Sequence, residues 1–114
     1  MRPHVELIQE SDLIWRPAEL PGGQGKGAKQ KNLSVDEEDG SASMRVVFDK
    51  AWIRPAGYHH ADVEWYVMGG RVRIGDRYLI KGGYWRAPAG LSVPKIEVEA
   101  GTEVLMFREY GDWG

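Results

Sequence analysis

From residue 44 onward, hydrophobic and polar residues alternate in short runs that are separated by glycine and proline. The segments 71–74 (Arg-Val-Arg-Ile) and 96–99 (Ile-Glu-Val-Glu) alternate with a period of two, which predicts half-buried β-strands. No window of a dozen residues combines helical periodicity with start and stop signals, so helices are not expected. Further strands are expected at residues 44–54 with a break at Asp49-Lys50, and at 63–68, 78–80, 84–86 and 104–107.

Glycine-rich turns set the spacing of these strands. Gly75-Asp76 is typical of the tight turn of a β-hairpin, here between residues 71–74 and 78–80. The chain contains 15 glycines and six prolines in 114 residues, as expected when turns are frequent. Short strands separated by turns about every 8–12 residues predict an all-β fold, either a sandwich or a small barrel.

The first part of the chain has a different pattern. Residues 1–43 are expected to form an N-terminal arm and loops that pack on a barrel of residues 44–114, the whole being one domain. Residues 31–35 are a candidate short strand. The glycine-rich stretch 20–30 lacks the spacing of a phosphate-binding loop, and the acidic turn 36–40 lacks the spaced ligands of a calcium loop. Both are expected to be surface loops.

Composition excludes several classes of protein. Lys and Arg number 15 against 17 Asp and Glu, which gives a formal net charge of −2 and no basic footprint for nucleic acid. No apolar run is long enough for a membrane span, and the first residues lack the apolar stretch of a secretory leader. Without cysteine there is no disulfide or thiolate site, which fits a cytoplasmic protein. Together with the charge and the absence of a long apolar run, we expect a protein that binds neither nucleic acid nor membrane.

Candidate chemistry is concentrated in residues 57–70. His59 and His60 lie next to the carboxylates of Asp62 and Glu64, and imidazole with carboxylate suits Fe, Mn, Ni, Cu or Zn. Adjacent residues of a strand point to opposite faces, so at most one of the two histidines faces an interior together with Glu64. This segment is the first candidate for a metal site, with His59, His60 and Glu64 as its ligands.

The segment 82–90 completes a resemblance to a known superfamily. Gly82, Pro88 and Gly90 match the first part of the second cupin motif, Gly-x5-Pro-x-Gly-x2-His-x3-Asn. The first cupin motif is Gly-x5-His-x-His-x3,4-Glu-x6-Gly, which the histidine-containing segment resembles in part. Over residues 44–108 the chain resembles the cupin superfamily, and within it the small single-domain bacterial cupins of the ChrR-like and uncharacterised type. The resemblance implies a double-stranded β-helix, that is, a small jelly-roll barrel.

The chain departs from both motifs. Cupin ligands are two His and one Glu from the first motif and one His from the second. Counted from Pro88 and Gly90, the second-motif His position holds Val93, which cannot bind a metal. In the first motif, the spacing from Glu64 to Gly70 is one residue shorter than the pattern. The resemblance therefore implies an incomplete metal site.

The first motif can be aligned in two registers. If His60 is the second histidine, the first histidine position holds Tyr58; if His59 is the second, that position holds Gly57. In either register one histidine and Glu64 remain. Two protein ligands rarely suffice for a metal. Candidates for a third ligand are Asp62, Tyr58 and His4.

Barrels of this size can enclose a cavity for one small ligand, and aromatic and arginine side chains are candidates to line it. Glu64 and Tyr66 share one face of their strand and Trp65 lies on the other; the resemblance implies that Glu64 faces the interior. An arginine in the cavity could clamp both oxygens of a carboxylate, whereas Arg71 and Arg73 are expected on the outer face. The candidate ligand-binding residues are Trp52, Arg54, Tyr66, Trp85 and Arg86.

Two functions from different classes follow from the resemblance. The first is an enzyme acting on a small carboxylate or carbonyl compound, as a metal-dependent dioxygenase, isomerase or lyase with Fe, Mn, Ni or Zn. In that case Glu64 and Tyr58 are the candidate catalytic acid and base, and Glu64 could also act as base without a metal. The second is a metal-free ligand-binding or sensing module without catalysis. Because cupins are commonly dimers, a homodimer is expected, with Trp15 and Trp113 at the interface.

Overall fold

The computed structural model describes residues 8–18, 20, 27–35, 41–58 and 62–109, and this part of the chain is almost entirely β-structure. One short 3₁₀ helix, η1 (Glu10–Asp12), precedes the strands. The strands are β1 (Arg16–Pro17), β2 (Ala28–Val35), β3 (Ala42–Phe48), β4 (Trp52–Arg54), β5 (Gly57–Tyr58), β6 (Asp62–Gly69), β7 (Val72–Ile74), β8 (Arg77–Leu79), β9 (Tyr84–Ala87), β10 (Ser92–Val93), β11 (Ile96–Val98) and β12 (Thr102–Glu109).

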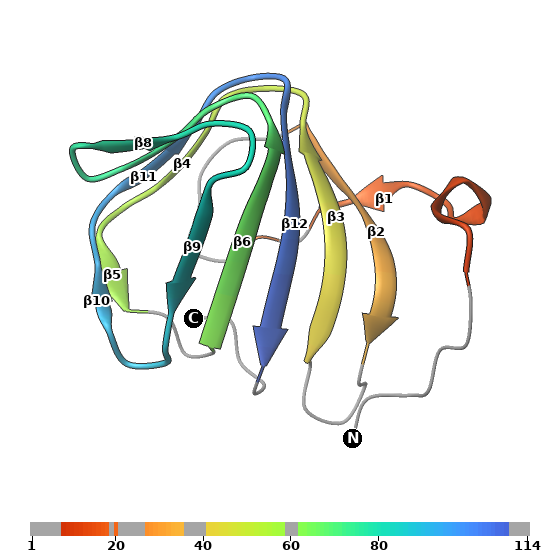
Figure 1. Cartoon of the computed structure of the whole chain (residues 1–114), viewed down its shortest axis with the longest axis horizontal. Coiled ribbons are helices and arrows are strands. Elements are labelled where there is room, and N and C mark those ends of the chain that lie inside the picture. Colours follow the sequence, from red (N-terminus) through yellow and green to blue (C-terminus); the bar gives the residue numbers. More distant parts are fainter. Residues whose placement is uncertain (1–7, 19, 21–26, 36–40, 59–61, 110–114) are drawn as a thin grey trace.

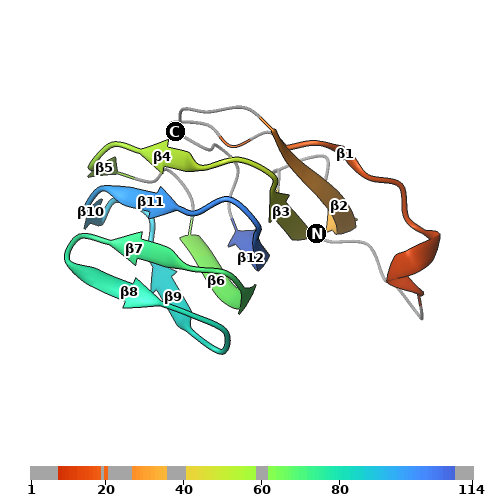
Figure 2. The ribbon, with the colours of Figure 1, turned by 90° about the horizontal axis from the view of Figure 1, so that it is seen from above.

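The strands form two antiparallel sheets that face each other (Figure 1). The larger sheet has the order β1-β2-β3-β12-β6-β9, the smaller has the order β4-β11-β7-β8, and β10 and β5 form a separate pair. In Figure 2 the smaller sheet lies across one side of the molecule, and β9, β6, β12 and β3 lie across the other. The predicted all-β fold and its jelly-roll arrangement are confirmed.

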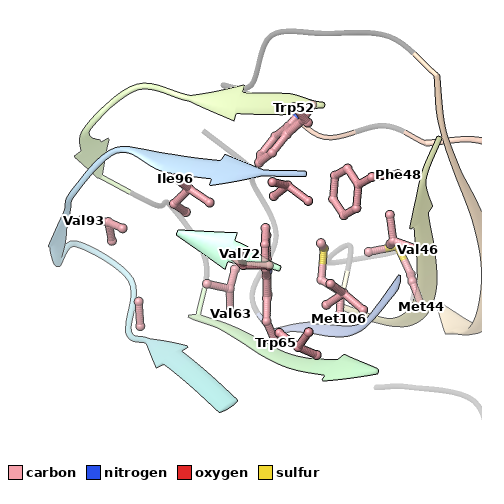
Figure 3. Close-up of a cluster of buried hydrophobic side chains, with 14 of the residues drawn as sticks. Met44, Val46, Phe48, Trp52, Val63, Trp65, Val72, Val93, Ile96 and Met106 are labelled. Carbon is pink, nitrogen blue, oxygen red and sulfur yellow. The ribbon is translucent and has the colours of Figure 1, made fainter. Parts of the chain in front are cut away.

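The core lies between the two sheets and follows from the alternation of the strands. In β3, Ala42, Met44, Val46 and Phe48 are buried, while the residues between them are only partly covered. A cluster of rings sits at the centre of this core (Figure 3). Its ring centroids are 5.6 Å apart for Phe48–Trp52, 6.2 Å for Trp52–Trp65 and 5.5 Å for Trp65–Trp85. Large rings at these distances bury more apolar area per residue than the surrounding valines do.

The N-terminal part is more regular than its composition indicates. Strand β2 covers Ala28–Val35 and pairs with β3 along its length, so residues 28–35 belong to the larger sheet. The larger sheet therefore begins earlier in the chain than the expected boundary near residue 44. Its strand there is also longer than the expected strand at 31–35. The predicted glycine-rich loop and acidic turn lie largely outside the described residues, at 21–26 and 36–40.

A cluster of charges ties the N-terminal arm to the outer face of the larger sheet. The ring of Trp15 lies 4.6 Å from Lys31 Nζ, and Glu10 bonds to both Arg45 and Lys31. The hydrogen bond from Arg45 holds the pKa of the Glu10 carboxyl below its ordinary value. Trp15, expected at a dimer interface, thus packs on cations of its own chain, which explains why Lys31 is buried.

The turn at Gly70 is the most demanding glycine position in the sheet connections. Gly70 has φ +83°, and a Cβ there would lie 2.5 Å from the Cα of Thr102, which is fully buried. Gly101 has a similar φ of +87°, but nothing lies within 4 Å of a Cβ at that position. Substitution at Gly101 would therefore cost backbone strain alone, whereas substitution at Gly70 would cost backbone strain and steric overlap.

Replacing either glycine by alanine should destabilise the protein to different extents. Gly101→Ala should lower the free energy of unfolding by about 1–2 kcal/mol, the cost of a left-handed L-residue. Gly70→Ala should cost roughly twice as much or more, because the backbone of Thr102 must also move. Urea unfolding followed by circular dichroism measures both values, and equal losses would contradict the close approach of Gly70 to Thr102.

Candidate functional site

The burial pattern of β6 shows which of its side chains face the interior. Val63, Trp65 and Val67 are buried, with exposed fractions of 1 %, 2 % and 0 %. Glu64 and Tyr66 alternate with them and lie on the outer face of the sheet, where Tyr66 is exposed. The expectation that Glu64 points into the barrel is wrong. Burial of the large Trp65 ring determines the orientation of the strand, and period-two geometry then turns Glu64 outward.

Glu64 takes part in a surface network instead. The hydroxyl of Tyr84, on the neighbouring strand β9, donates a hydrogen bond to Glu64 Oε1, and this bond raises the pKa of the Tyr84 hydroxyl. Beside this pair, Arg86 lies 3.7 Å from the Asp62 carboxylate. Tyr66 and Arg86 are therefore outer-face residues and do not line the space between the sheets, contrary to expectation.

The inward position of Val63 gives a third alignment of the first cupin motif. Counted from residue 63 rather than Glu64, the spacing to Gly70 has the six intervening residues that the pattern requires. This register makes His59 the second histidine and places Gly57 at the first histidine position. Val63 then occupies the glutamate position and, like Val93 at the second-motif histidine, is buried.

The described residues of this site do not form the four-ligand metal centre of a cupin. Three of the four cupin ligand positions hold Gly57, Val63 and Val93, which have no donor side chain, and His59 and His60 lie outside the described residues. Within the described ranges, no three His, Cys, Asp or Glu side chains come together as a possible metal site.

The other proposed third ligands are engaged or turned away. The carboxylate of Asp62 accepts a 2.7 Å hydrogen bond from the backbone N–H of Ala89. Tyr58 is 62 % exposed on β5, and the expected ligand His4 lies outside the described residues.

Arg54 is a charged side chain that the structure buries. It is the last residue of β4, is 6 % exposed, and pairs across the sheet with Ile96, which is fully buried. Its Nη2 donates a 2.8 Å hydrogen bond to the carbonyl of Tyr58, and its Nη1 makes a 3.5 Å contact with the carbonyl of Pro55. These bonds hold the guanidinium against the β4–β5 connection, beside the strand that pairs with Val93.

The charge of Arg54 has no counter-charge in the described part of the chain. Burial lowers the pKa of the guanidinium, and no neighbouring carboxylate opposes this effect. The group nevertheless stays protonated, because the guanidinium of arginine is not deprotonated in proteins. A guanidinium carries five N–H donors, and the two backbone carbonyls satisfy only part of them. A buried cation of this kind favours an anion as its partner.

Two predicted aromatic lining residues have separate roles. Trp52 is 5 % exposed and packs between Phe48 and Trp65, so it fills the interior rather than lining a cavity. Trp85 is half-buried on β9 and lines a groove at the edge of the sheets.

The expectation that Arg71 and Arg73 lie on the outer face is confirmed, because both are exposed and pair with surface carboxylates.

Known structures share this fold. A proposed dioxygenase from Nostoc punctiforme superposes with a TM-score of 0.79 at 22 % identity, covering 91 % of this chain but only 38 % of that protein. A proposed acetylacetone dioxygenase from Methylibium petroleiphilum superposes with a TM-score of 0.72 at 20 % identity, covering 96 % of this chain and 83 % of that one. A protein with a cupin-like fold from Ralstonia eutropha gives a TM-score of 0.61 at 20 % identity, covering 75 % and 56 %.

Fold and motif together define the class of protein. The chain has the cupin fold, a double-stranded β-helix, and three of the four metal-ligand positions in the alignment through Val63 hold residues without donor groups. It belongs to the family described as Domain of unknown function (DUF4437), whose model matches residues 6–114. No curated protein matches the chain in sequence. Within the described residues there is no helix of the length and apolar character that a membrane crossing needs.

The alignment through Val63 predicts the metal content of the protein. Tag-free protein, purified without added metal or reconstituted with Fe²⁺, Mn²⁺, Ni²⁺ or Zn²⁺, should contain far less than one equivalent by elemental analysis. The combined variant Gly57→His, Val63→Glu and Val93→His restores the four-ligand set and should take up about one equivalent. Stoichiometric metal in the wild type, lost in Glu64→Ala, would contradict the alignment and the outward position of Glu64.

Proposed function

We propose that this protein binds a small organic carboxylate at the end of the barrel marked by Arg54, and that it does so without a resident metal. The observation that carries the proposal is the buried guanidinium, which has carbonyl partners but no carboxylate among the described residues. Three of the four cupin ligand positions hold glycine or valine, which favours organic-anion binding over metal-dependent catalysis.

A carboxylate is the best match to the chemistry at Arg54. The planar guanidinium presents parallel N–H donors that fit both oxygens of a carboxylate, and the charged hydrogen bonds are strong in an apolar surrounding. A neutral ligand would leave the buried charge uncompensated, and a cationic one would add to it. The buried side chains of Val93 and Ile96 give the surroundings an apolar character suited to the carbon skeleton of a small metabolite.

The roles of the surrounding residues follow from their positions. The carbonyl of Tyr58 fixes one end of the guanidinium and so orients its remaining N–H groups. The Tyr58 side chain is exposed, and Glu64 on the outer face of the sheet takes no part. The names of two structural relatives indicate dioxygenase chemistry in those proteins. A metal-dependent enzyme is therefore the second candidate function.

Calorimetric titration of EDTA-treated protein tests the proposal. Acetate, malonate and succinate are the probes, and acetamide is the uncharged counterpart of acetate. At least one carboxylate should bind measurably, and acetamide should not. Arg54→Met should weaken that binding about 10–100-fold, the loss expected for a charge-assisted hydrogen bond of roughly 1.5–3 kcal/mol. Arg54→Lys should retain part of the affinity.

The matched control is Arg86→Met, which removes an exposed arginine from the outer face. It should leave carboxylate binding unchanged, and thermal unfolding confirms that each variant is folded. Unaltered affinity in a folded Arg54→Met variant, or no binding by any probe, would refute the proposal. Binding that appears only after Fe²⁺ is added would favour the metal-dependent enzyme instead.

A further inference from the structure

We propose a second binding site, distinct from the Arg54 site, in the groove between the hairpin β7–β8 and strand β9, and we infer that it takes a small aromatic carboxylate. The groove has a volume of about 350 Å³, within the range of roughly 300–1,000 Å³ that small-molecule sites occupy. It is lined by Ile74, Arg77, Tyr78, Leu79, Tyr84 and Trp85.

The groove lies where the edges of the two sheets meet. Strand β8 ends the smaller sheet and β9 ends the larger one, and Figure 2 shows the two strands side by side at one edge of the molecule. The lining residues therefore come from both sheets, and no hydrogen-bonded strand covers the opening between them in the described part of the chain. An open junction of two sheet edges is a natural place for a ligand.

Strand register shows that the floor of the groove continues the core. Val72 is fully buried and pairs with Leu79, so Leu79 shares its inner face. Trp85 pairs with the buried Trp65 on β6, and the two rings meet edge to face at 5.5 Å. The floor is thus an apolar and aromatic surface, held rigid by the core behind it.

Arg77 brings a positive charge to the same face. It pairs with Ile74 in the hairpin, and Ile74 lies on the same side of β7 as the buried Val72. No hydrogen bond, ion pair or ring contact involves Arg77 among the residues that the structure describes. Its guanidinium is available to a ligand in the groove.

The other arginines of the hairpin are already engaged. Arg71 pairs with Glu99, and Arg73 lies 3.9 Å from Glu97. Both guanidinium groups also stack on the ring of Tyr78, at 4.7 Å and 5.5 Å from its centroid. Arg77 is therefore the cation of this hairpin that lacks a carboxylate partner in the described residues, and it is the one that lines the groove.

These features together select the class of ligand. An unpaired guanidinium favours a carboxylate, which it can bind through both oxygens. Trp85 on the floor offers aromatic surface to a ring, and such contacts add to the area buried. The site thus fits a planar ring that carries one carboxylate.

The groove and the Arg54 site are separate. Arg54, Ile96, Ile74 and Arg77 pair in one row across the strands β4, β11, β7 and β8. Three strand spacings of about 4.8 Å put the Cα atoms of the two arginines roughly 14 Å apart. The fully buried Ile96 lies between them. Each site is therefore tested with its own carboxylate and its own arginine variant.

Titration with benzoate, followed by the NMR signal of the Trp85 indole N–H, tests the inference. Benzoate should shift that signal in a saturable way, whereas the neutral benzamide and the non-aromatic cyclohexanecarboxylate should bind at least about 10-fold more weakly. Arg77→Gln should weaken benzoate binding about 10-fold or more. Arg77 is exposed on an edge strand, so this variant should fold.

Two control variants distinguish this site from its alternatives. Arg86→Gln changes the exposed arginine next to Trp85 on the opposite face and should leave benzoate affinity unchanged. Arg54→Met should also leave it unchanged, even where binding of aliphatic carboxylates is lost. The inference fails if benzoate does not shift the Trp85 signal, if Arg77→Gln binds as well as wild type, or if Arg54→Met abolishes the effect.

Discussion

The burial of Trp65 at the centre of the core is the constraint on which the rest of the structure depends. Its ring packs against Phe48, Trp52 and Trp85, and its neighbours two positions away on β6 are buried valines. Because a strand turns successive side chains to opposite faces, this packing fixes Glu64 on the outside. The carboxylate that a cupin metal site needs cannot be supplied from the outer face, so the central tryptophan also determines the chemistry of the interior.

Arg54 gives the interior of the barrel a buried positive charge. The usual ligand positions hold Gly57, Val63 and Val93, which bring no negative charge, and Arg54 enters from the smaller sheet beside them. Like a metal ion, a guanidinium can present a positive charge to an anionic or polarised ligand in an apolar surrounding. A guanidinium, however, supplies shape-selective hydrogen bonds and no redox or Lewis-acid chemistry, and on this basis we propose binding rather than oxygenation.

The extent to which the sequence predicts this structure depends on how local the signals are. The hairpin at 71–80 follows from strict alternation and from the Gly75-Asp76 turn, and the structure forms it as β7 and β8. Strand β2 is longer than expected because Ala28 and the polar residues after it carry little hydrophobic signal, and pairing with β3 recruits them. The sequence alone could have predicted the outward orientation of Glu64, since the spacing to Gly70 matches the motif only when it is counted from position 63.

No local pattern predicts whether a given arginine is buried or exposed. Arg54 and Arg86 lie in similar short aromatic segments, yet one is buried and the other exposed, because strand pairing alone sets their faces.

We propose that the buried guanidinium of Arg54 is the ligand-binding group and that it needs no metal. The most direct measurement is the ¹⁵N–¹H NMR signal of its Nε–H in EDTA-treated protein, assigned by its absence in Arg54→Lys and followed as malonate is added. The account predicts one protected signal that shifts downfield and exchanges more slowly with water as malonate saturates the site. A signal that stays unchanged through the titration, or that responds only after Fe²⁺ is supplied, would contradict it.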